Sequence, residues 1–266
     1  MPSVTQPVAW VTDPVALTPV TSCGDMWLKR DDLFHYAGCR GGKVRICLAL
    51  ARAAKGLVAA SHRHSPQMSM VSRIARELGL PCRIHTATGT ETQQMSLAIG
   101  NGASIVQHTP GYNGVIIARA RQDAASLGWK EIPFGMESED GIRCTAPQTA
   151  NIPAAARRIV IAVGIGMALS GVLHGLLQRH RRLPVLAVAV GLPKPEKYIS
   201  RLAPPEWEDQ VSLVRAPENY SDHVTASVGG VPLDPVYEAK AARFLRSGDC
   251  FWVVGNREMA TGCSGP

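Results

Sequence analysis

The chemistry that this 266-residue chain could perform is most visible at a lysine behind two glycines. Lys43 follows Gly41 and Gly42 and precedes a run rich in Ala and Leu, so we expect it at a loop-to-helix junction. A lysine amine does covalent work when its pKa is lowered or when it condenses with a carbonyl to a Schiff base. The alternative is a solvated lysine at a helix start, and this motif alone does not decide between them.

A glycine loop in the middle of the chain is a second motif. The loop consists of Gly164, Ile165, Gly166, Met167 and Ala168. It follows an apolar run at 159–163 and precedes a helical pattern, so its backbone amides and the helix N-terminus could bind an anion. A dinucleotide fingerprint would need Gly or Ala in place of Leu169 and an acidic residue about twenty positions further on, and the sequence has neither. We predict a cup for a single phosphate; a tight strand-to-helix turn is the alternative.

A polar segment precedes another predicted helix. The hydroxyl of Ser65, the amide of Gln67 and the free amides of the first helical turn could hold a carboxylate. Ser65 could equally cap the helix, with Pro66 at its first position, and the two roles are compatible. His62 and His64 are candidate acid–base groups. We expect no metal there, because two alternating histidines need further ligands.

The elements that must position these residues alternate between short apolar strands and helices. The expected strands lie at 26–29, 57–60, 81–86, 103–107, 131–134, 158–163, 184–190 and 250–254. The expected helices lie at 44–55, 67–78, 92–99, 114–127, 167–180 and 235–245. This alternation predicts an α/β fold with two lobes, built on open parallel sheets with flanking helices. We expect an extended arm over residues 1–22 and a loop region over 135–153 that joins the lobes.

Composition narrows the class of protein. The apolar fraction is 45% and the charged fraction 18%, as in an ordinary soluble globule. The sequence contains no apolar run near the roughly 18 residues that span a bilayer and no recognisable secretory signal. Its seven cysteines are scattered without a C-x-x-C pair, so we expect reduced thiols in a cytoplasmic protein.

The charge of the chain has two interpretations. A net charge of +7 attracts anionic ligands such as phosphates and carboxylates. Gathered on one face, it would instead indicate a nucleic-acid partner. The densest cluster, residues 179–182, ends a predicted helix, where cations interact favourably with the helix dipole. We therefore expect a solvated helix end at that cluster.

In chain order, these motifs resemble the fold-type II pyridoxal-phosphate (PLP) enzymes, which are related to tryptophan synthase β. Within them, the sequence is most similar to the branch of 1-aminocyclopropane-1-carboxylate (ACC) deaminase and D-cysteine desulfhydrase. The family patterns K-R-D-D-L and G-G-N-K-x-R resemble residues 29–33 and 41–45, and Q-S-N-[HQ] resembles 64–67. The family's phosphate loop resembles 164–168, and L-D-P-V-Y-[ET]-G-K resembles 233–240.

The resemblance implies a role for each matching residue of the cofactor site. Lys43 would hold PLP as a Schiff base and move protons on the substrate, and the 164–168 loop would bind the phosphate. Glu238 would face the pyridine nitrogen, and Tyr237 would lie on the substrate side. A carboxylate on that nitrogen keeps it protonated and makes the ring a deep electron sink. The deaminase subgroup has this glutamate.

On the substrate side, the resemblance assigns the carboxylate to His64, Ser65 and Gln67, with Ser65 also among the catalytic residues. Three departures from the family fall in the site, and one of them is the replacement of its glycine-rich C-terminal H-T-G-G stretch by residues 253–256. Gly42 replaces an asparagine, and Pro66 replaces the asparagine that approaches the phenolic oxygen of the cofactor. These departures leave the cofactor prediction in place and leave the substrate open.

We therefore expect a PLP-dependent enzyme that acts on an amino acid through an external aldimine, as a deaminase or β-elimination lyase. One alternative is a PLP enzyme that modifies an amino acid on a larger anionic carrier, such as modified nucleic acid. Another is a non-catalytic binding protein with the same fold. The resemblance implies a homodimer. We expect a large PLP-binding domain of residues 1–49 with 146–266 and a small domain of residues 50–145.

Overall fold

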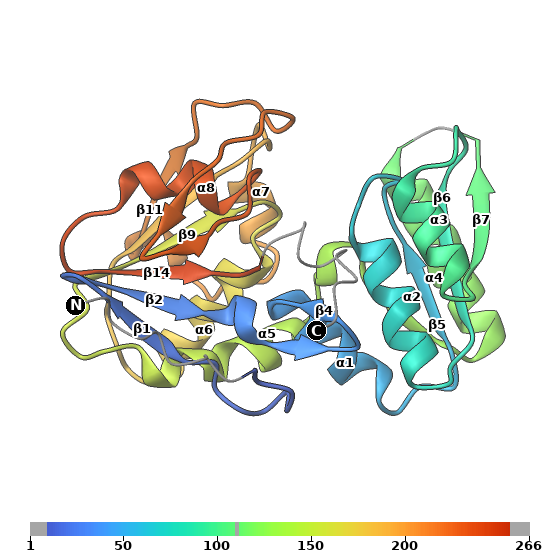
Figure 1. The fold of residues 1–266 in the computed structure, drawn as a ribbon, viewed down its shortest axis with the longest axis horizontal. Helices are drawn as coiled ribbons and strands as arrows, with labels where there is room; N and C mark the ends of the chain where they lie inside the picture. The colour runs from blue at the N-terminus through green and yellow to red at the C-terminus, as the bar shows by residue number, and fades with distance from the viewer. Residues whose placement is uncertain (1–9, 110–111, 256–266) are drawn as a thin grey trace.

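The computed structural model describes residues 10–109 and 112–255 of the chain and shows two lobes, each built on its own sheet (Figure 1). This confirms the prediction of an α/β fold with open parallel sheets and flanking helices. The domain boundaries at 49/50 and 145/146 stay a prediction. Residues 1–9 of the expected N-terminal arm and the end of the large domain beyond residue 255 lie outside the described residues.

The larger sheet has six strands in the order β1-β2-β14-β9-β10-β11. Their bounds are β1 (Val20–Cys23), β2 (Met26–Arg30), β14 (Asp249–Val253), β9 (Arg158–Val163), β10 (Val185–Ala189) and β11 (Val211–Arg215). Strand β1 pairs antiparallel with β2, and the remaining neighbours are parallel. Successive residues of β9 face opposite sides, so Ile161 packs in the cluster that includes Leu173 of α6 (Met167–Gln178), whereas Val160 packs in the opposite cluster.

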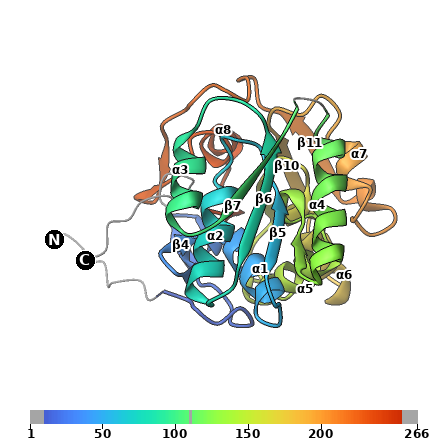
Figure 2. The same ribbon diagram turned by 90° about the vertical axis from the view of Figure 1, so that its right-hand side faces the viewer.

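The smaller sheet is parallel throughout, with the order β7-β6-β5-β8. Its strands are β5 (Leu57–Ala60), β6 (Cys82–Ala87), β7 (Ser104–His108) and β8 (Lys130–Ile132). One face is covered by α1 (Gly42–Ala51), α2 (Gln67–Glu77) and α3 (Gln93–Gly100), and the other by α4 (Asn113–Leu127), as Figure 2 shows. Strand β5 is buried on both faces because Leu57 and Ala59 join the first cluster and Val58 and Ala60 the second.

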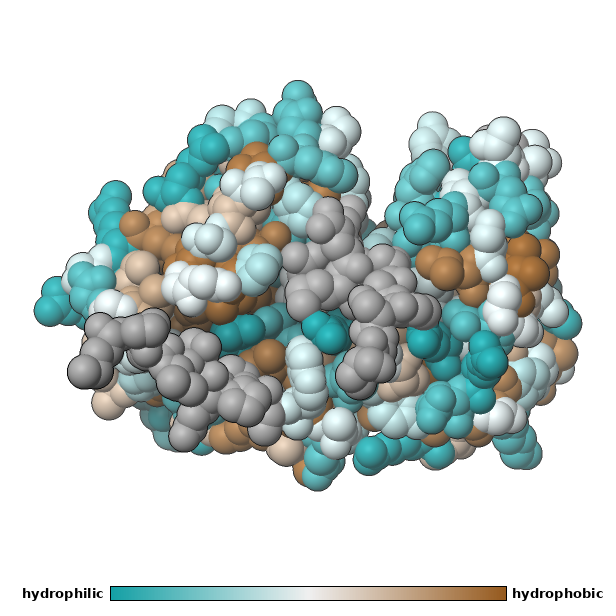
Figure 3. All heavy atoms as spheres, in the orientation of Figure 1, coloured by the Kyte–Doolittle hydropathy of each residue, from teal (hydrophilic) through white to brown (hydrophobic). Residues whose placement is uncertain are grey.

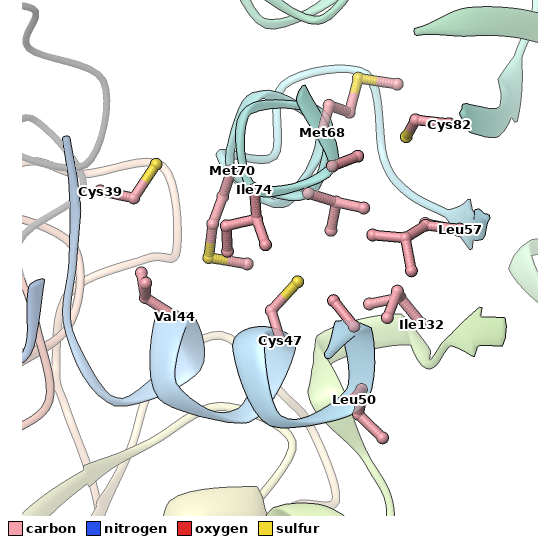
Figure 4. Packing of buried hydrophobic residues seen from close by; sticks show 14 of the residues in the cluster. Cys39, Val44, Cys47, Leu50, Leu57, Met68, Met70, Ile74, Cys82 and Ile132 are labelled. Atoms are coloured by element: carbon pink, nitrogen blue, oxygen red, sulfur yellow. The ribbon is translucent and has the colours of Figure 1, made fainter. Parts of the chain in front are cut away.

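Helix α1 packs with the smaller sheet, although its first turn is held by the larger lobe. Val44, Cys47 and Leu50 of α1 lie in the same buried cluster as Ile74 of α2 and Leu57 of β5 (Figure 4). The helix that begins at the predicted catalytic lysine therefore belongs to the core of the smaller lobe.

The prediction of a loop over residues 135–153 is wrong. This segment contains α5 (Glu139–Thr145), preceded by the 3-10 helix η2 (Phe134–Met136) and followed by η3 (Ala146–Asn151). Helix α5 begins where the Ser138 hydroxyl accepts a hydrogen bond from the Gly141 amide at 3.0 Å. A serine followed by two acidic residues is a helix-start signal, and a glycine inside the turn weakens it.

The remaining elements are short. They are η1 (Asp31–Leu33), β3 (His35–Tyr36), β4 (Cys39–Arg40), α7 (Glu196–Ile199), η4 (Trp207–Asp209), β12 (Ser227–Val228), β13 (Val231–Pro232), α8 (Glu238–Ala241) and η5 (Ala242–Phe244). Part of the expected arm is also paired, because β1 joins the sheet and Val11 bridges to Phe34. No helix in residues 10–109 and 112–255 has the length and apolar character needed to span a bilayer.

Candidate active site

The predicted site residues of the larger lobe follow three neighbouring parallel strands. The chain continues from β2 to Lys43, from β9 to Gly164 and from β14 to Val254. Because the carboxyl ends of parallel strands meet at one edge, these segments are brought together. In Figure 1, β2 and β14 point toward the side where α1 and the smaller lobe lie, and Figure 3 shows the surface hollowed between the lobes.

Lys43 stands in the first turn of α1, and its position is fixed by the backbone of Val254. The Gly42 amide donates a hydrogen bond to the Val254 carbonyl at 2.9 Å. Gly41 has a φ of 107°, and a Cβ atom there would lie 2.8 Å from the same carbonyl oxygen. Glycine at 41 therefore lets the two segments meet, while the Lys43 side chain is exposed and accessible to a ligand.

Glu238 is held by the other side of the same backbone segment. It is the first residue of α8 and is 3% exposed, and its Oε1 accepts a hydrogen bond from the Val254 amide at 3.0 Å. Burial, with a smaller contribution from the charge of Asp234, raises the pKa of Glu238 to about 8. Residue 254 thus connects the buried carboxyl group to the helix start that carries Lys43.

The glycine loop lies against Tyr237. A Cβ atom at Gly164 would lie 3.0 Å from the Tyr237 hydroxyl, so a side chain there would require the Tyr237 ring to shift. Gly166 has a φ of 88° and directly precedes α6, a 12-residue helix whose first-turn amides have no partner within the helix. Tyr237 and Glu238 are consecutive, so the loop and the buried carboxyl group border the same region.

The loop also contacts the turn before α5. The Ile165 Cδ1 atom lies 2.2 Å from where a Cβ atom at Gly135 would stand. The Met167 sulfur lies 3.0 Å from where a Cβ atom at Gly141 would stand. Two residues of this turn, Gly135 and Met136, have a left-handed backbone with φ of 64° and 66°. Left-handed methionine is strained, so the surrounding contacts must hold the turn in place.

Gln67 of the smaller lobe supplies one of those contacts. Its side-chain Nε2 donates to the Pro133 carbonyl at 3.0 Å, and its Oε1 accepts from the Gly135 amide at 2.9 Å. Both ends of the side-chain amide are therefore engaged by the turn that touches Ile165. The predicted role of Gln67 in binding a substrate carboxylate stays a prediction.

Ser65 and His64 lie on the loop after β5. The Ser65 hydroxyl accepts a hydrogen bond from the Gln67 amide at 3.3 Å, which is the capping interaction that the sequence allowed. The rings of His64 and His62 are 5.6 Å apart, and His62 has a lowered pKa because of burial and its neighbours His64 and Arg63. Within the described chain, no hydrogen bond or ion pair joins His64 or Ser65 to Lys43, Tyr237 or Glu238.

Three features of the site were not visible in the sequence. Val254 acts through its backbone, which no residue type reveals. Tyr220 contacts Tyr237 edge-on with ring centroids 5.9 Å apart, and the buried Lys240 side chain holds the Tyr220 segment by donating to the Asn219 carbonyl at 2.5 Å. The spacing of Tyr220 and Tyr237 gives no pattern by itself, although Lys240 closes the motif that contains Tyr237.

The third feature is a buried ion pair below Lys43. Arg45 and Asp31 are joined at 2.8 Å with side chains 1% and 3% exposed. A Cβ atom at Gly42 would lie 2.6 Å from Asp31 Oδ2. In this chain, a side chain at position 42 would therefore require the carboxylate of Asp31 to move.

The donor set fits PLP. An accessible amine can bind an aldehyde, the amides at a helix N-terminus can bind a phosphate, and a buried carboxyl group can pair with a ring nitrogen. Lys29 does not compete for the aldehyde, although burial lowers its pKa to about 8. Its Nζ is buried and donates to the Thr18 carbonyl at 2.7 Å and to Asn151 Oδ1 at 2.9 Å.

The overall arrangement is the fold of the fold-type II PLP enzymes, as the sequence motifs predicted. The structure of an ACC deaminase homologue is similar with a TM-score of 0.73 and 20% identity, covering 95% of this chain and 93% of that one. Processed threonine deaminase isoform 2 from Solanum lycopersicum has a TM-score of 0.61 and 15% identity, covering 90% of this chain and 79% of that one.

Apo diaminopropionate ammonia lyase from Escherichia coli has a TM-score of 0.59 and 12% identity, covering 91% of this chain and 83% of that one. No protein-family model matches the sequence, and no curated protein is significantly similar to it. At sequence identities this low, the structural similarity establishes the fold alone, so the function must be argued from the site.

Proposed function

We propose that the protein is a PLP-dependent enzyme that acts on an amino acid, as a deaminase or a β-elimination lyase. The observation that carries this proposal is the backbone of Val254, which binds Glu238 through its amide and Gly42 through its carbonyl. It sets the buried carboxyl group and the helix start that carries Lys43 on two sides of one segment. The glycine loop, which lies against Tyr237, completes the donor set.

Each residue has a defined task in this proposal. Lys43 would hold the cofactor aldehyde, and its amine would move a proton at the α or β carbon of the substrate. The amides of residues 164–168 hold the phosphate. When bound, PLP supplies an electron sink for the bond-breaking step. Tyr237, beside Gly164, faces the substrate side and can hold or pass a proton at its hydroxyl.

Glu238 has the protonation state that this role requires. With a pKa raised to about 8, its carboxyl group carries a proton at neutral pH in the absence of a basic partner. Glu238 could give that proton to a ring nitrogen of the cofactor, and the Val254 amide would then stabilise the resulting carboxylate. The charge of the nitrogen and that of Glu238 are thus formed as a pair.

The names of structurally similar proteins support the proposed reaction class. Their descriptions name an ACC deaminase homologue, a threonine deaminase and a diaminopropionate ammonia lyase. Release of ammonia from an amino acid is common to the names of these proteins, so we propose it for this chain. The substrate itself, with a carboxylate bound near Ser65, His64 and the Gln67 amide, is part of the proposal.

The visible absorption spectrum tests the cofactor and its lysine. The purified protein supplemented with PLP should show an absorption band at a longer wavelength than that of free PLP, and borohydride should bleach this band. Peptide mapping after reduction should find a pyridoxyl group on Lys43. Lys43→Ala should lack both signals while retaining the wild-type melting temperature. A protein that stays colourless with added PLP would contradict the proposal and favour a non-catalytic binding protein.

An amino acid on a larger carrier is a second candidate substrate. The net charge of +7 is compatible with an amino acid on an anionic carrier such as modified nucleic acid, but it is a property of the whole chain. Spectral shifts on adding free amino acids, compared with those on adding nucleic-acid-linked amines, would distinguish these substrates.

We also propose a homodimer in the cytoplasm. Light scattering of the purified protein tests the dimer.

A further inference from the structure

A cavity of about 770 Å³ lies at the end of α1 remote from Lys43. Its wall includes Ala49 and Leu50 of α1, Ala53 in the turn that follows, and Cys144 of α5. Lys43 and Leu50 are separated by about two helical turns, or roughly 10 Å along the axis. None of the residues that line the cavity belongs to the candidate active site, so it is a separate feature of the molecule.

The inner surface of the cavity is mainly apolar. Ala49 and Ala53 are small and exposed, and Trp129 forms the side next to Gly56. A Cβ atom at Gly56 would lie 2.4 Å from Trp129 Cδ2, so the indole packs directly on the backbone and is held there. A volume of this size is that of a small-molecule site.

The charged residues of the cavity are unbalanced. Asp140 forms ion pairs with both Lys130, at 3.5 Å, and Arg143. Lys55 also lines the cavity, and it forms no ion pair with any residue in the described part of the chain. Arg143 also pairs with Glu139 at 3.8 Å, so three cations share two carboxylates, which leaves an excess of one positive charge beside the apolar wall.

We propose that this cavity binds a small monocarboxylate with an apolar body. The carboxylate would lie near Lys55 and Arg143 and supply the missing negative charge, while the hydrocarbon part would cover Ala49, Ala53 and Trp129. Because the cavity is bounded by α1 and α5 as well as by the turn before β8, the ligand would contact the helix that carries Lys43. The proposal does not depend on the proposed PLP chemistry.

Isothermal titration calorimetry with octanoate, and with octan-1-ol as the uncharged counterpart, tests the site. We expect saturable octanoate binding that is stronger than binding of octan-1-ol. The double variant Lys55→Gln/Arg143→Gln should weaken octanoate about fivefold or more and leave octan-1-ol unchanged, as expected for exposed charge pairs. Lys194→Gln, which removes one positive charge at a lysine that does not line the cavity, is the control and should change neither affinity.

Substitutions that fill the cavity test whether the ligand binds there. Ala49→Phe should abolish binding of both compounds, and Ala53→Phe provides a second variant if the first lowers the melting temperature. Absence of saturable heat up to about 10 mM octanoate, a concentration that corresponds to very weak affinity, would overturn the proposal. So would unchanged octanoate binding in both phenylalanine variants, or equal loss of binding in Lys194→Gln and the double variant.

Discussion

Glu238 is the site residue whose protonation most affects the stability of the protein. Burial raises its pKa from 4.5 to about 8, so the folded chain keeps a proton that the unfolded chain loses between these values. The free energy of unfolding therefore falls as pH rises through this window. In the cofactor-free protein, we expect Glu238→Gln to match the wild type near pH 5 and to exceed it by on the order of 2 kcal/mol at pH 8.5.

Urea unfolding at the two pH values measures this difference. Glu208→Gln is a suitable control because Glu208 is exposed, and it should change stability little at either pH. An equal gain at both pH values in Glu238→Gln would show that packing and not protonation is responsible. With PLP bound, the same variant should lose affinity for the cofactor, because glutamine cannot give the ring nitrogen a proton.

Gly42 is the second residue at which a side chain would act directly on the site. A Cβ atom there would lie 2.6 Å from Asp31 Oδ2, and the buried pair with Arg45 prevents that carboxylate from moving away. We expect Gly42→Ala to destabilise the protein by about 1–3 kcal/mol. Gly114 lies in the first turn of α4, and within the described residues no neighbouring atom lies within 4 Å of a Cβ atom placed there, so Gly114→Ala should instead be neutral or stabilising by up to about 1 kcal/mol.

Both variants are compared by thermal unfolding and by PLP titration. If Gly42→Ala were as stable as Gly114→Ala, the Asp31–Arg45 pair would have to be mobile.

Sequence patterns point to candidate residues with reactive side chains and do not point to residues that act through their backbone. Lys43 is predicted from an amine behind two glycines, whereas Glu238 is predicted from the resemblance of residues 233–240 to a family pattern, and both roles stay predictions. Val254 was missed because its role depends on an amide and a carbonyl that every residue has. The contact of Tyr220 with Tyr237 was missed because it depends on how a loop returns to the sheet.

At the scale of elements, apolar patterning predicted the buried strands and helices well. Strands were expected at 57–60 and 158–163, and the structure has β5 (Leu57–Ala60) and β9 (Arg158–Val163). The predicted helix over 235–245 is instead α8 (Glu238–Ala241) followed by η5 (Ala242–Phe244). Asp234 accounts for the later start, because its Oδ1 accepts hydrogen bonds from the amides of Val236 and Tyr237. Local side-chain bonds of this kind are not encoded in apolar periodicity.

The turn at 133–136 is the element whose shape depends most on one side chain. Gln67 satisfies the Pro133 carbonyl and the Gly135 amide, and this turn includes Met136 in a left-handed conformation. Gln67→Met keeps the side-chain length and removes both hydrogen bonds, so we expect a loss of about 1–3 kcal/mol. Because Ile165 packs on Gly135, we also expect weaker PLP binding.

Hydrogen exchange of the 132–141 peptide, together with a PLP titration, tests this coupling. Gln93→Met is the matched control on an exposed position of α3 and should leave both unchanged. Loss of stability without faster exchange in that peptide would mean that the turn is held by other contacts. Loss of PLP binding without any change in exchange would instead assign Gln67 a direct role at the ligand.

At the scale of the whole molecule, Lys43 lies where the two lobes join. Its helix packs in the core of the smaller lobe through Val44 and Cys47, whereas Gly42 is bonded to Val254 of the larger lobe. The glycine loop and Glu238 belong to the larger lobe. The relative position of the lobes therefore sets the distance between the amine and the rest of the cofactor site, and alternation of strands and helices in the sequence does not determine that position.

This arrangement predicts that the two faces of the smaller sheet contribute differently to cofactor binding. Ile74 of α2 packs in the cluster that contains α1 (Figure 4), and Ile116 of α4 packs on the opposite face of the same sheet. Ile74→Ala and Ile116→Ala remove the same atoms from buried positions, so each should destabilise the protein by about 2–4 kcal/mol in urea unfolding. We expect PLP affinity to fall in Ile74→Ala, because α1 loses its support, and to stay close to wild type in Ile116→Ala. Equal loss of affinity in both would show that cofactor binding follows overall stability and not the placement of α1.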